Sequence, residues 1–250
     1  MKAIIYAAGI GRRLEGRFGP CPKVLLEFGG RSLLDWHLQR LKETGCEELV
    51  VVTGYQRKEL ETAVAELGQR HGVRTRALNN PDFSEGSVLS FAVSLPELET
   101  QREPLLLMDG DVLYPAAMLR QLWRSPHATA LLVDRNYSKA DDDPVLVPMR
   151  AGKPFDFRKL WTGEAEAVGE SIGFFKLAPR DLPRLIEETR KRMTGAGRKD
   201  SYDDVLRELV MEGRFGAEDV TGLPWTEIDI PEDADRAERE VLPAILRLKA

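Results

Sequence analysis

Short apolar runs alternate with amphipathic stretches along the first half of the chain. The runs that have the length of a buried strand are residues 2–7, 48–54, 73–78 and 104–108. Apolar residues recur at helical spacing in residues 32–44, 57–67 and 87–95. Strands and helices that alternate in this way predict an α/β fold, with a mainly parallel central sheet and helices on both of its faces.

The second half of the chain is less regular. The segments that we expect to be strands are residues 128–134, 145–149, 155–159, 171–177 and 226–230. The segments that we expect to be helices are residues 180–193, 203–212 and a stretch that begins at Pro231. An acidic loop, Asp141–Asp143, is assigned no function. There is no internal repeat, low-complexity tract or linker, so we expect residues 1–250 to form a single domain.

The composition is that of an ordinary globular protein, with 42% hydrophobic and 31% charged residues. A net charge of −5 gives no reason to expect nucleic acid or an anionic membrane as a partner. Neither the two cysteines nor His37, His71 and His127 have metal-ligand spacing, and no apolar run reaches 18 residues. We therefore expect a cytoplasmic protein without membrane insertion. No stretch marks a large apolar interface, so the chain could be a monomer or a homodimer.

A glycine turn follows the first predicted strand. Gly9 and Gly11 allow successive backbone N–H groups to converge on a phosphate. The turn lacks the third glycine of a dinucleotide-binding fingerprint, and the chain has no Walker sequence. What remains is a glycine turn with Arg12 and Arg13, and with Lys23 ten residues further on. These residues predict either a phosphate-binding loop or an exposed basic loop.

Two carboxylates, Asp109 and Asp111, follow the strand predicted at residues 104–108. Ligands of open α/β sheets bind at the carboxyl ends of the strands, where the glycine turn is also expected. Carboxylate oxygens suit Mg²⁺, which takes one or two of them together with phosphate oxygens. The alternative is a turn that is stabilised by aspartate side chains.

The motifs resemble those of the nucleoside-triphosphate transferase family, which includes the sugar-1-phosphate nucleotidyltransferases. The family pattern A-A-G-x-G-x-R-L, then P-K, then G-x-x-L-L is present at residues 7–14, 22–23 and 30–34. This resemblance implies a Rossmann-like three-layer α/β/α fold of the nucleotide-diphospho-sugar transferase (GT-A-like) type. It also implies that Arg13 and the glycine loop hold a triphosphate, and that Lys23 neutralises the phosphate under attack.

The resemblance also implies which residues bind the nucleotide and the metal. The expected nucleotide-binding residues are Ala7, Ala8, Gly9, Gly11, Arg12, Gly86, Ser87 and Asp109. Asp111 becomes a ligand of Mg²⁺. Residues 227–233 resemble the I-D-T-P-E-D segment of several cytidylyltransferases, which makes Asp229 the second ligand and Glu227 the second choice. Glu232 and Asp233 are expected to cap a helix.

Residues 85–90 indicate one branch of the family. They are more similar to phosphocholine-type cytidylyltransferases than to the Gly-Thr-Ala segment of sugar-1-phosphate enzymes. This branch includes phosphocholine, aminoethylphosphonate and inositol-1-phosphate cytidylyltransferases. The resemblance places Lys159 near the acceptor phosphate, and the expected acceptor-binding residues are Glu170, Ser171, Tyr202, Asp203, Trp225 and Glu227. Alternatively, Ser87 only caps a helix and Trp225 belongs to the core.

The expected activity is Mg²⁺-dependent transfer of CMP from CTP to a small phosphorylated alcohol or phosphonate, with release of pyrophosphate. Residues 1–125 would bind the nucleotide, and residues 126–250 would bind the acceptor and supply the second metal ligand. One alternative is a sugar-1-phosphate nucleotidyltransferase that uses UTP or another nucleotide. A second is a non-catalytic nucleotide sensor, which would not need Arg13, Lys23, Asp111 and Asp229 together.

Overall fold

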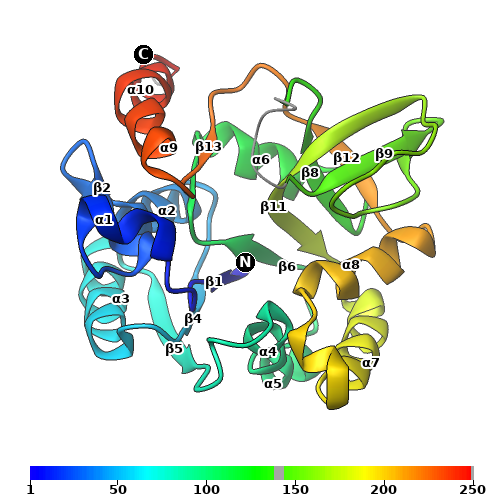
Figure 1. Cartoon of the computed structure of the whole chain (residues 1–250), viewed down its shortest axis with the longest axis horizontal. Coiled ribbons are helices and arrows are strands. Elements are labelled where there is room, and N and C mark those ends of the chain that lie inside the picture. The colour runs from blue at the N-terminus through cyan, green and yellow to red at the C-terminus, as the bar shows by residue number, and fades with distance from the viewer. Residues whose placement is uncertain (138–143, 249–250) are drawn as a thin grey trace. The chain divides into compact units, whose positions relative to one another are not determined.

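The computed structural model describes residues 1–137 and 144–248, so the acidic loop Asp141–Asp143 lies outside the described residues. The chain forms two compact units (Figure 1). The first contains residues 1–84, 108–120 and 223–250, and the second contains residues 85–107 and 121–222. Each unit is therefore assembled from segments that are distant in the sequence.

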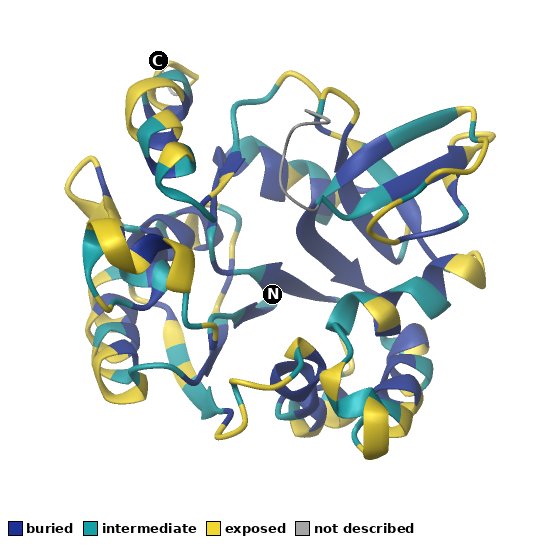
Figure 2. Cartoon of the chain, viewed as in Figure 1, coloured by how far each residue is buried: buried dark blue, intermediate teal, exposed yellow. Residues whose placement is uncertain are grey.

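The first unit is built on parallel strands. β1 (Lys2–Tyr6) pairs in parallel with β4 (Glu48–Thr53), and β4 pairs in parallel with β5 (Arg74–Asn79). β6 (Leu105–Asp109) pairs with β1 and ends in this unit. β1 and β4 are almost wholly buried, whereas β5 at the edge keeps exposed positions (Figure 2). Their burial explains why these strands read as continuous apolar runs.

Helices and short paired strands complete the first unit. The helices are α1 (Glu15–Phe18), α2 (Leu33–Glu43), α3 (Arg57–His71), α6 (Ala116–Arg124, shared with the second unit), α9 (Pro231–Arg236) and α10 (Leu242–Arg247). Single turns occupy Arg12–Leu14, Lys23–Leu25 and Ala237–Val241. The short strands are β2 (Glu27–Phe28), β3 (Arg31–Ser32), β7 (Val112–Leu113) and β13 (Thr226–Glu227). α2 begins at Ser32, whose hydroxyl accepts from Asp35 N at 3.2 Å.

The second unit is mainly antiparallel. Its strands are β8 (Ala130–Asp134), β9 (Leu146–Arg150), β10 (Lys153–Pro154), β11 (Ala167–Leu177) and β12 (Gly216–Asp219). β11 pairs antiparallel with β8 and β9, while β12 pairs in parallel with β8. The helices are α4 (Ser87–Ala92), α5 (Leu95–Thr100), α7 (Leu182–Arg192) and α8 (Tyr202–Met211), with single turns at Pro179–Asp181 and Gly195–Lys199.

The prediction of an α/β fold with a mainly parallel central sheet and packed helices is confirmed. The strand expected at residues 155–159 is wrong, because only Arg158 forms an isolated bridge, to Leu146. Asp156 accepts from Phe157 N at 2.8 Å and from Arg207 Nε at 2.6 Å, which ties this segment into an irregular loop. The helix expected at residues 87–95 ends at Ala92. A second helix, α5, begins at Leu95 and has Pro96 in its first turn.

Within residues 1–137 and 144–248, none of the helices combines the length and the apolar character needed to cross a membrane.

Candidate active site

The glycine turn after β1 is an open backbone loop in the first unit. A side chain at Gly9 would meet nothing within 4 Å, so the backbone there faces open space. Gly11 has a φ of +69°, and a Cβ at this position would lie 2.8 Å from Cγ of Lys23. Only glycine combines this left-handed conformation with such a close approach. The turn therefore brings accessible backbone and the Lys23 side chain together.

Lys23 connects this loop to two of the predicted metal ligands. Its ammonium group lies 3.0 Å from Oδ2 of Asp111 and also forms an ion pair with Oδ1 of Asp229. Burial would lower the pKa of Lys23, but the charges of the two carboxylates outweigh it and raise the pKa above the usual value. Lys23 is therefore a permanent cation at the centre of the site.

Strand pairing explains how Asp229 reaches Asp111. β13 runs antiparallel to β7, with Thr226 opposite Leu113 and Glu227 opposite Val112. The ladder continues as Ile228 N donates to the carbonyl of Asp111 at 2.9 Å. Since Asp111 directly precedes β7 and Asp229 is the second residue after β13, the pairing places the two aspartates side by side.

Asp229 is also held by groups that follow it and by Arg13. Its N–H donates to Oδ2 of Asp233 at 2.9 Å, as does Ile230 N at 3.0 Å, so the prediction that Asp233 is a cap is confirmed. The guanidinium of Arg13 donates to Oδ2 of Asp229 at 2.9 Å. The side chain of Arg13 is about half exposed.

Three carboxylates form an acidic cluster. Oxygens of Asp111, Glu227 and Asp229 lie within 4.8 Å of one another. The protein surrounding Glu227 and the negative charges of Asp111, Asp229 and Asp109 raise its pKa well above the usual value, although the residue keeps contact with solvent. A divalent cation such as Mg²⁺ would relieve the repulsion between these carboxylates, and their oxygens are the ligands that it prefers. Glu227, predicted to bind the acceptor, thus lies among the candidate metal ligands.

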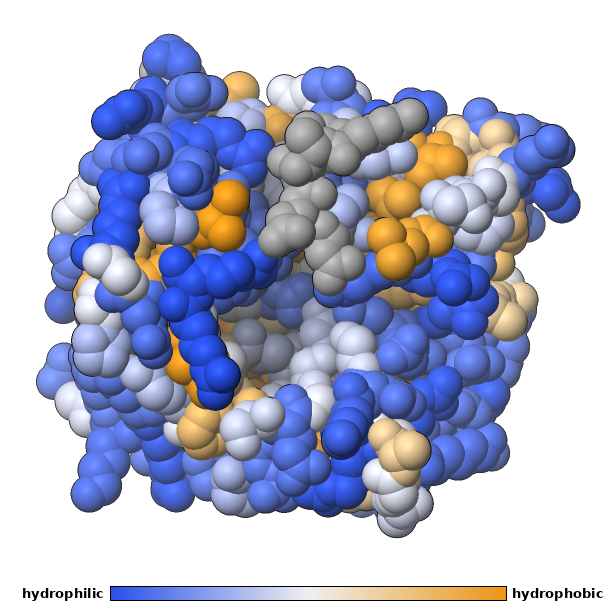
Figure 3. Space-filling model, viewed as in Figure 1, coloured by the Kyte–Doolittle hydropathy of each residue, from blue (hydrophilic) through white to orange (hydrophobic). Residues whose placement is uncertain are grey.

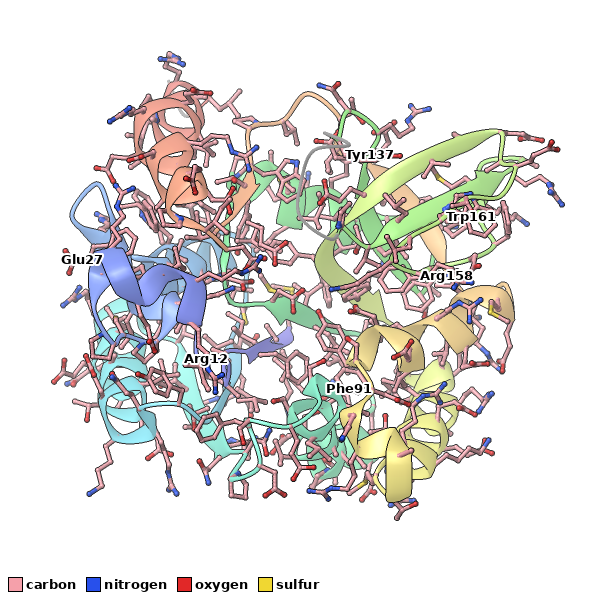
Figure 4. All side chains as sticks on the ribbon, viewed as in Figure 1. Arg12, Glu27, Phe91, Tyr137, Arg158 and Trp161 are labelled. Carbon is pink, nitrogen blue, oxygen red and sulfur yellow. The ribbon has the colours of Figure 1, made fainter. Side chains whose placement is uncertain are left out.

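A cavity of about 280 Å³ opens onto this cluster within the first unit. Its walls include Ala7, Gly9, Gly11, Arg12, Arg13, Lys23, Asp111 and Asp229, all of which the sequence predicted as site residues. Arg12, labelled in Figure 4, contributes a second exposed guanidinium to this wall. Ala8 is buried, and its carbonyl accepts from Tyr55 N at 3.1 Å. The cavity brings three cationic side chains and the glycine turn together with two carboxylates, a combination that suits a metal ion and a triphosphate.

The second unit holds Gly86 and Ser87 against the start of α8. Gly86 N donates to the carbonyl of Arg198 at 3.0 Å, and a Cβ on Gly86 would lie 2.5 Å from this carbonyl oxygen. Ser87 Oγ accepts from Tyr202 N at 3.1 Å and lies 3.1 Å from Oγ of Ser201. Ser201 Oγ in turn donates to Asp203 at 2.7 Å. Ser87, Tyr202 and Asp203 therefore form one polar cluster, in which Ser87 is exposed and the other two residues are partly buried.

A separate group of predicted residues follows β9 and β11. Glu170 of β11 lies opposite Leu146, and Leu146 also bridges Arg158, which precedes Lys159. Glu170 is buried, whereas Lys159 is exposed. Ser171 adjoins a bulge, where its Oγ accepts from Gly173 N at 3.2 Å. The ladder thus places Arg158 and Glu170 on either side of Leu146, and Lys159 is the residue next to Arg158.

An aromatic corner lies next to this group. Phe155 and Trp161 meet edge to face with ring centroids 5.6 Å apart, and the Arg150 guanidinium lies 5.0 Å from the Phe155 ring. Trp161 and Arg158 are labelled in Figure 4 beside β9. Figure 3 shows hydrophobic residues gathered over the same strands of the second unit. Trp225, by contrast, belongs to the first unit, immediately before β13.

His37, for which the sequence predicted no function, lies against the acidic turn. His37 is fully buried in α2, and its Nε2 lies 3.0 Å from the carbonyl oxygen of Gly110. One feature of the sequence could have indicated a role for His37: it is a polar residue on the apolar face of a predicted helix, between Leu34 and Leu38. Its partner, the carbonyl of a glycine 73 residues away, could not be read from that pattern.

Fold and site together define an α/β protein in which a glycine turn, three cationic side chains and two carboxylates line one cavity. The profile described as the MobA-like NTP transferase domain matches residues 3–167. The chain belongs to this family, which confirms the predicted nucleotidyltransferase resemblance.

Relatives of several specificities resemble this chain. CMP-5′-(3-aminopropyl)phosphonate synthase of Streptomyces rubellomurinus is 30% identical over 97% of the chain. N-acetylmuramate alpha-1-phosphate uridylyltransferase of Neisseria meningitidis is 32% identical over 91% of the chain and 93% of its own length. The chain spans only 39% of the length of the Streptomyces protein. The structure of the inositol-1-phosphate CTP transferase from T. maritima shares 23% identity, covers 99% of this chain and 96% of its own, and has a TM-score of 0.79.

Proposed function

We propose that the protein is a divalent-metal-dependent cytidylyltransferase, which transfers CMP from CTP to a small phosphorylated alcohol or phosphonate and releases pyrophosphate. The observation that carries the proposal is the position of Lys23. Its ammonium group lies between Asp111 and Asp229 and lines the same cavity as the glycine turn. A cation and two carboxylates that share one cavity with a phosphate-binding loop support nucleotidyl transfer.

The residues of the first unit would act by positioning and by charge. The acceptor's phosphate or phosphonate oxygen is already an anion, so attack on the α-phosphorus needs no general base. Lys23 would offset the negative charge on the α-phosphate, while Arg13, Arg12 and the N–H groups of the glycine turn would hold the β- and γ-phosphates as the leaving group. Mg²⁺ bound by Asp111 and Asp229, with Glu227 as a third candidate ligand, would supply further neutralisation of phosphate charge.

Residues of the second unit are proposed to contact the other parts of the substrates. Gly86 and Ser87 would bind the nucleotide. Lys159 supplies a cation for the acceptor phosphate, while Glu170, Ser171, Tyr202 and Asp203 offer groups that recognise hydroxyls or an amine. Trp225 and Glu227, which belong to the first unit, complete the proposed acceptor-binding set. The relatives whose names include CMP or CTP support cytosine as the base.

A second candidate is a sugar-1-phosphate uridylyltransferase. The 32% identity to the N-acetylmuramate alpha-1-phosphate uridylyltransferase favours it, because that match covers more than nine tenths of both chains. The two candidates share the metal and phosphate chemistry, so the first unit does not distinguish between them.

Pyrophosphate release measured with CTP, UTP, GTP, ATP and dTTP tests both candidates. Each nucleotide is combined with phosphocholine, inositol-1-phosphate, aminoethylphosphonate, glycerol-3-phosphate and sugar-1-phosphates. Release that depends on CTP and on a non-sugar acceptor supports the proposal. Release with UTP and a sugar-1-phosphate supports the second candidate, and no release with any pair contradicts both and favours a nucleotide sensor.

A further inference from the structure

Two hydrogen bonds hold the turn at Gly110, one to each of the two peptide groups that meet at this residue. Gly110 N donates to the carbonyl of Tyr6 in β1 at 3.2 Å, and a Cβ on Gly110 would lie 3.1 Å from that oxygen. The carbonyl of Gly110 accepts from Nε2 of His37 at 3.0 Å. Because a peptide unit is planar, this carbonyl shares its plane with the N–H of Asp111. A bond that fixes the carbonyl therefore also fixes the direction in which Asp111 leaves the turn.

The hydrogen positions in this contact follow from the partners. A carbonyl oxygen can only accept, so Nε2 of His37 carries the hydrogen. Burial lowers the pKa of His37 to about 4, and the ring is neutral at physiological pH. Nδ1 then has a lone pair, which lies 3.1 Å from the hydroxyl of Tyr114 and accepts its hydrogen. Burial raises the pKa of Tyr114, so this hydroxyl keeps its proton. Both ring nitrogens have partners.

We propose that His37 is a positioning residue for the metal site, because its Nε2–H group holds the Gly110 carbonyl and thereby aims the Asp111 carboxylate at the acidic cluster. This inference rests on the proposed function, in which Asp111 is a metal ligand. His37 is not among the residues that line the cavity. It acts through one backbone carbonyl, in the way that groups behind a metal site hold its ligands in place.

The alternative is that His37 only fills space in the core. His37→Gln and His37→Met distinguish the two explanations, because both replacements are unbranched and similar in length. Glutamine can still donate from its amide to the Gly110 carbonyl, whereas methionine cannot. A packing role predicts similar effects of the two variants, while the positioning role predicts that only methionine impairs the metal site.

The test is Mn²⁺ binding to the whole protein, followed by electron paramagnetic resonance, with urea unfolding as the measure of stability. We expect His37→Met to bind Mn²⁺ about 10-fold more weakly than wild type, and His37→Gln to stay within about 3-fold. Tyr114→Phe is the control, since it removes the hydroxyl on the other side of the ring; it should lower stability but leave Mn²⁺ affinity within about 3-fold.

Asp111→Asn separates failure of this inference from failure of the proposed function. If neither Asp111→Asn nor His37→Met weakens binding, or wild type binds no Mn²⁺, the metal site itself is wrong. If Asp111→Asn weakens binding and His37→Met binds as wild type does, only the positioning role is wrong. Should His37→Met not fold, His37→Gln decides the question, because a loss of Mn²⁺ affinity above 10-fold in a stably folded Gln variant contradicts the donor role.

Discussion

The ammonium group of Lys23 forms an ion pair with the carboxylate of Asp229, although 206 residues separate the two in the sequence. Asp111, 88 residues after Lys23, accepts from the same ammonium group. One lysine therefore joins the N-terminal glycine turn, the acidic turn after β6 and the strand that precedes α9. The first predictions concern this three-residue arrangement.

Replacing Lys23 by methionine should lower the rate of pyrophosphate release by about 10²-fold or more, which is the scale of losing one preorganised electrostatic group. The reason is that the charge of the α-phosphate would no longer be offset by the ammonium group. The measurement is turnover with whichever nucleotide and acceptor support it. Lys58→Met is the matched control, because Lys58 is exposed on α3, and it should turn over as wild type does. Near-normal turnover of Lys23→Met would contradict the proposal that Lys23 offsets the charge of the α-phosphate.

Asp111→Asn and Asp229→Asn should each lower turnover by about 10²-fold, and the double variant should lose much less than the product of the two effects. In the proposed mechanism both carboxylates would bind the same divalent cation, so the loss of either one would already remove most of the contribution of the metal ion. Single and double variants are compared in one assay. Asp235→Asn serves as the control, because Asp235 pairs at 2.7 Å with Arg17 on the surface. Fully multiplicative losses would show that the two acids act independently.

Gly86→Ala should lower the free energy of unfolding by about 1–3 kcal/mol, the usual cost of forcing extra atoms into a packed site. A Cβ there would lie 2.5 Å from the carbonyl oxygens of Arg198 and Asp200, and backbone cannot move aside as a flexible side chain can. Urea unfolding measures the change. Gly16→Ala provides the comparison, because a Cβ at Gly16 in α1 meets nothing within 4 Å and should leave stability unchanged or slightly higher.

Glu188 should make stability depend on acid pH. Burial alone would raise the pKa of Glu188, but hydrogen bonds from Lys191, Arg184 and Arg192 outweigh it and lower the pKa to about 2. A carboxyl whose pKa is lower in the folded state stabilises the fold above its ordinary pKa, which is 4.5. That contribution is lost as the pH falls from about 4.5 towards 2.

Glu188→Gln should therefore lower the free energy of unfolding at pH 7 by about 2 kcal/mol. This is less than the full shift implies, since Lys191 is half in water. The difference from wild type should shrink as the pH falls below about 4.5. Urea unfolding at several pH values gives the comparison. Glu187→Gln, at an exposed neighbouring position that also pairs with Lys191, should change stability by less than about 0.5 kcal/mol. If the difference in stability between Glu188→Gln and wild type does not change with pH, the lowered pKa of Glu188 is contradicted.

The sequence alone determined the parallel α/β core and the identity of most polar groups in the cavity. Buried parallel strands are continuous apolar runs, and amphipathic helices show their period locally, so neighbouring residues carry this information. The glycine turn was equally readable, because its conformation depends on Gly9 and Gly11 themselves. The loop at residues 155–159 was misread, since the contact from Asp156 to Arg207 that bends it is not local.

Only the tertiary structure decided how the cluster is assembled. Asp229 reaches Asp111 because β13 pairs with β7, two-residue strands whose pairing has no signal in either segment. The same pairing places Glu227 next to Asp111 and Asp229. His37 can donate to the Gly110 carbonyl only when α2 is packed beside the acidic turn. These contacts depend on the free energy of the whole fold. Residue types could therefore be read from the sequence, whereas their distances and protonation had to come from the packed chain.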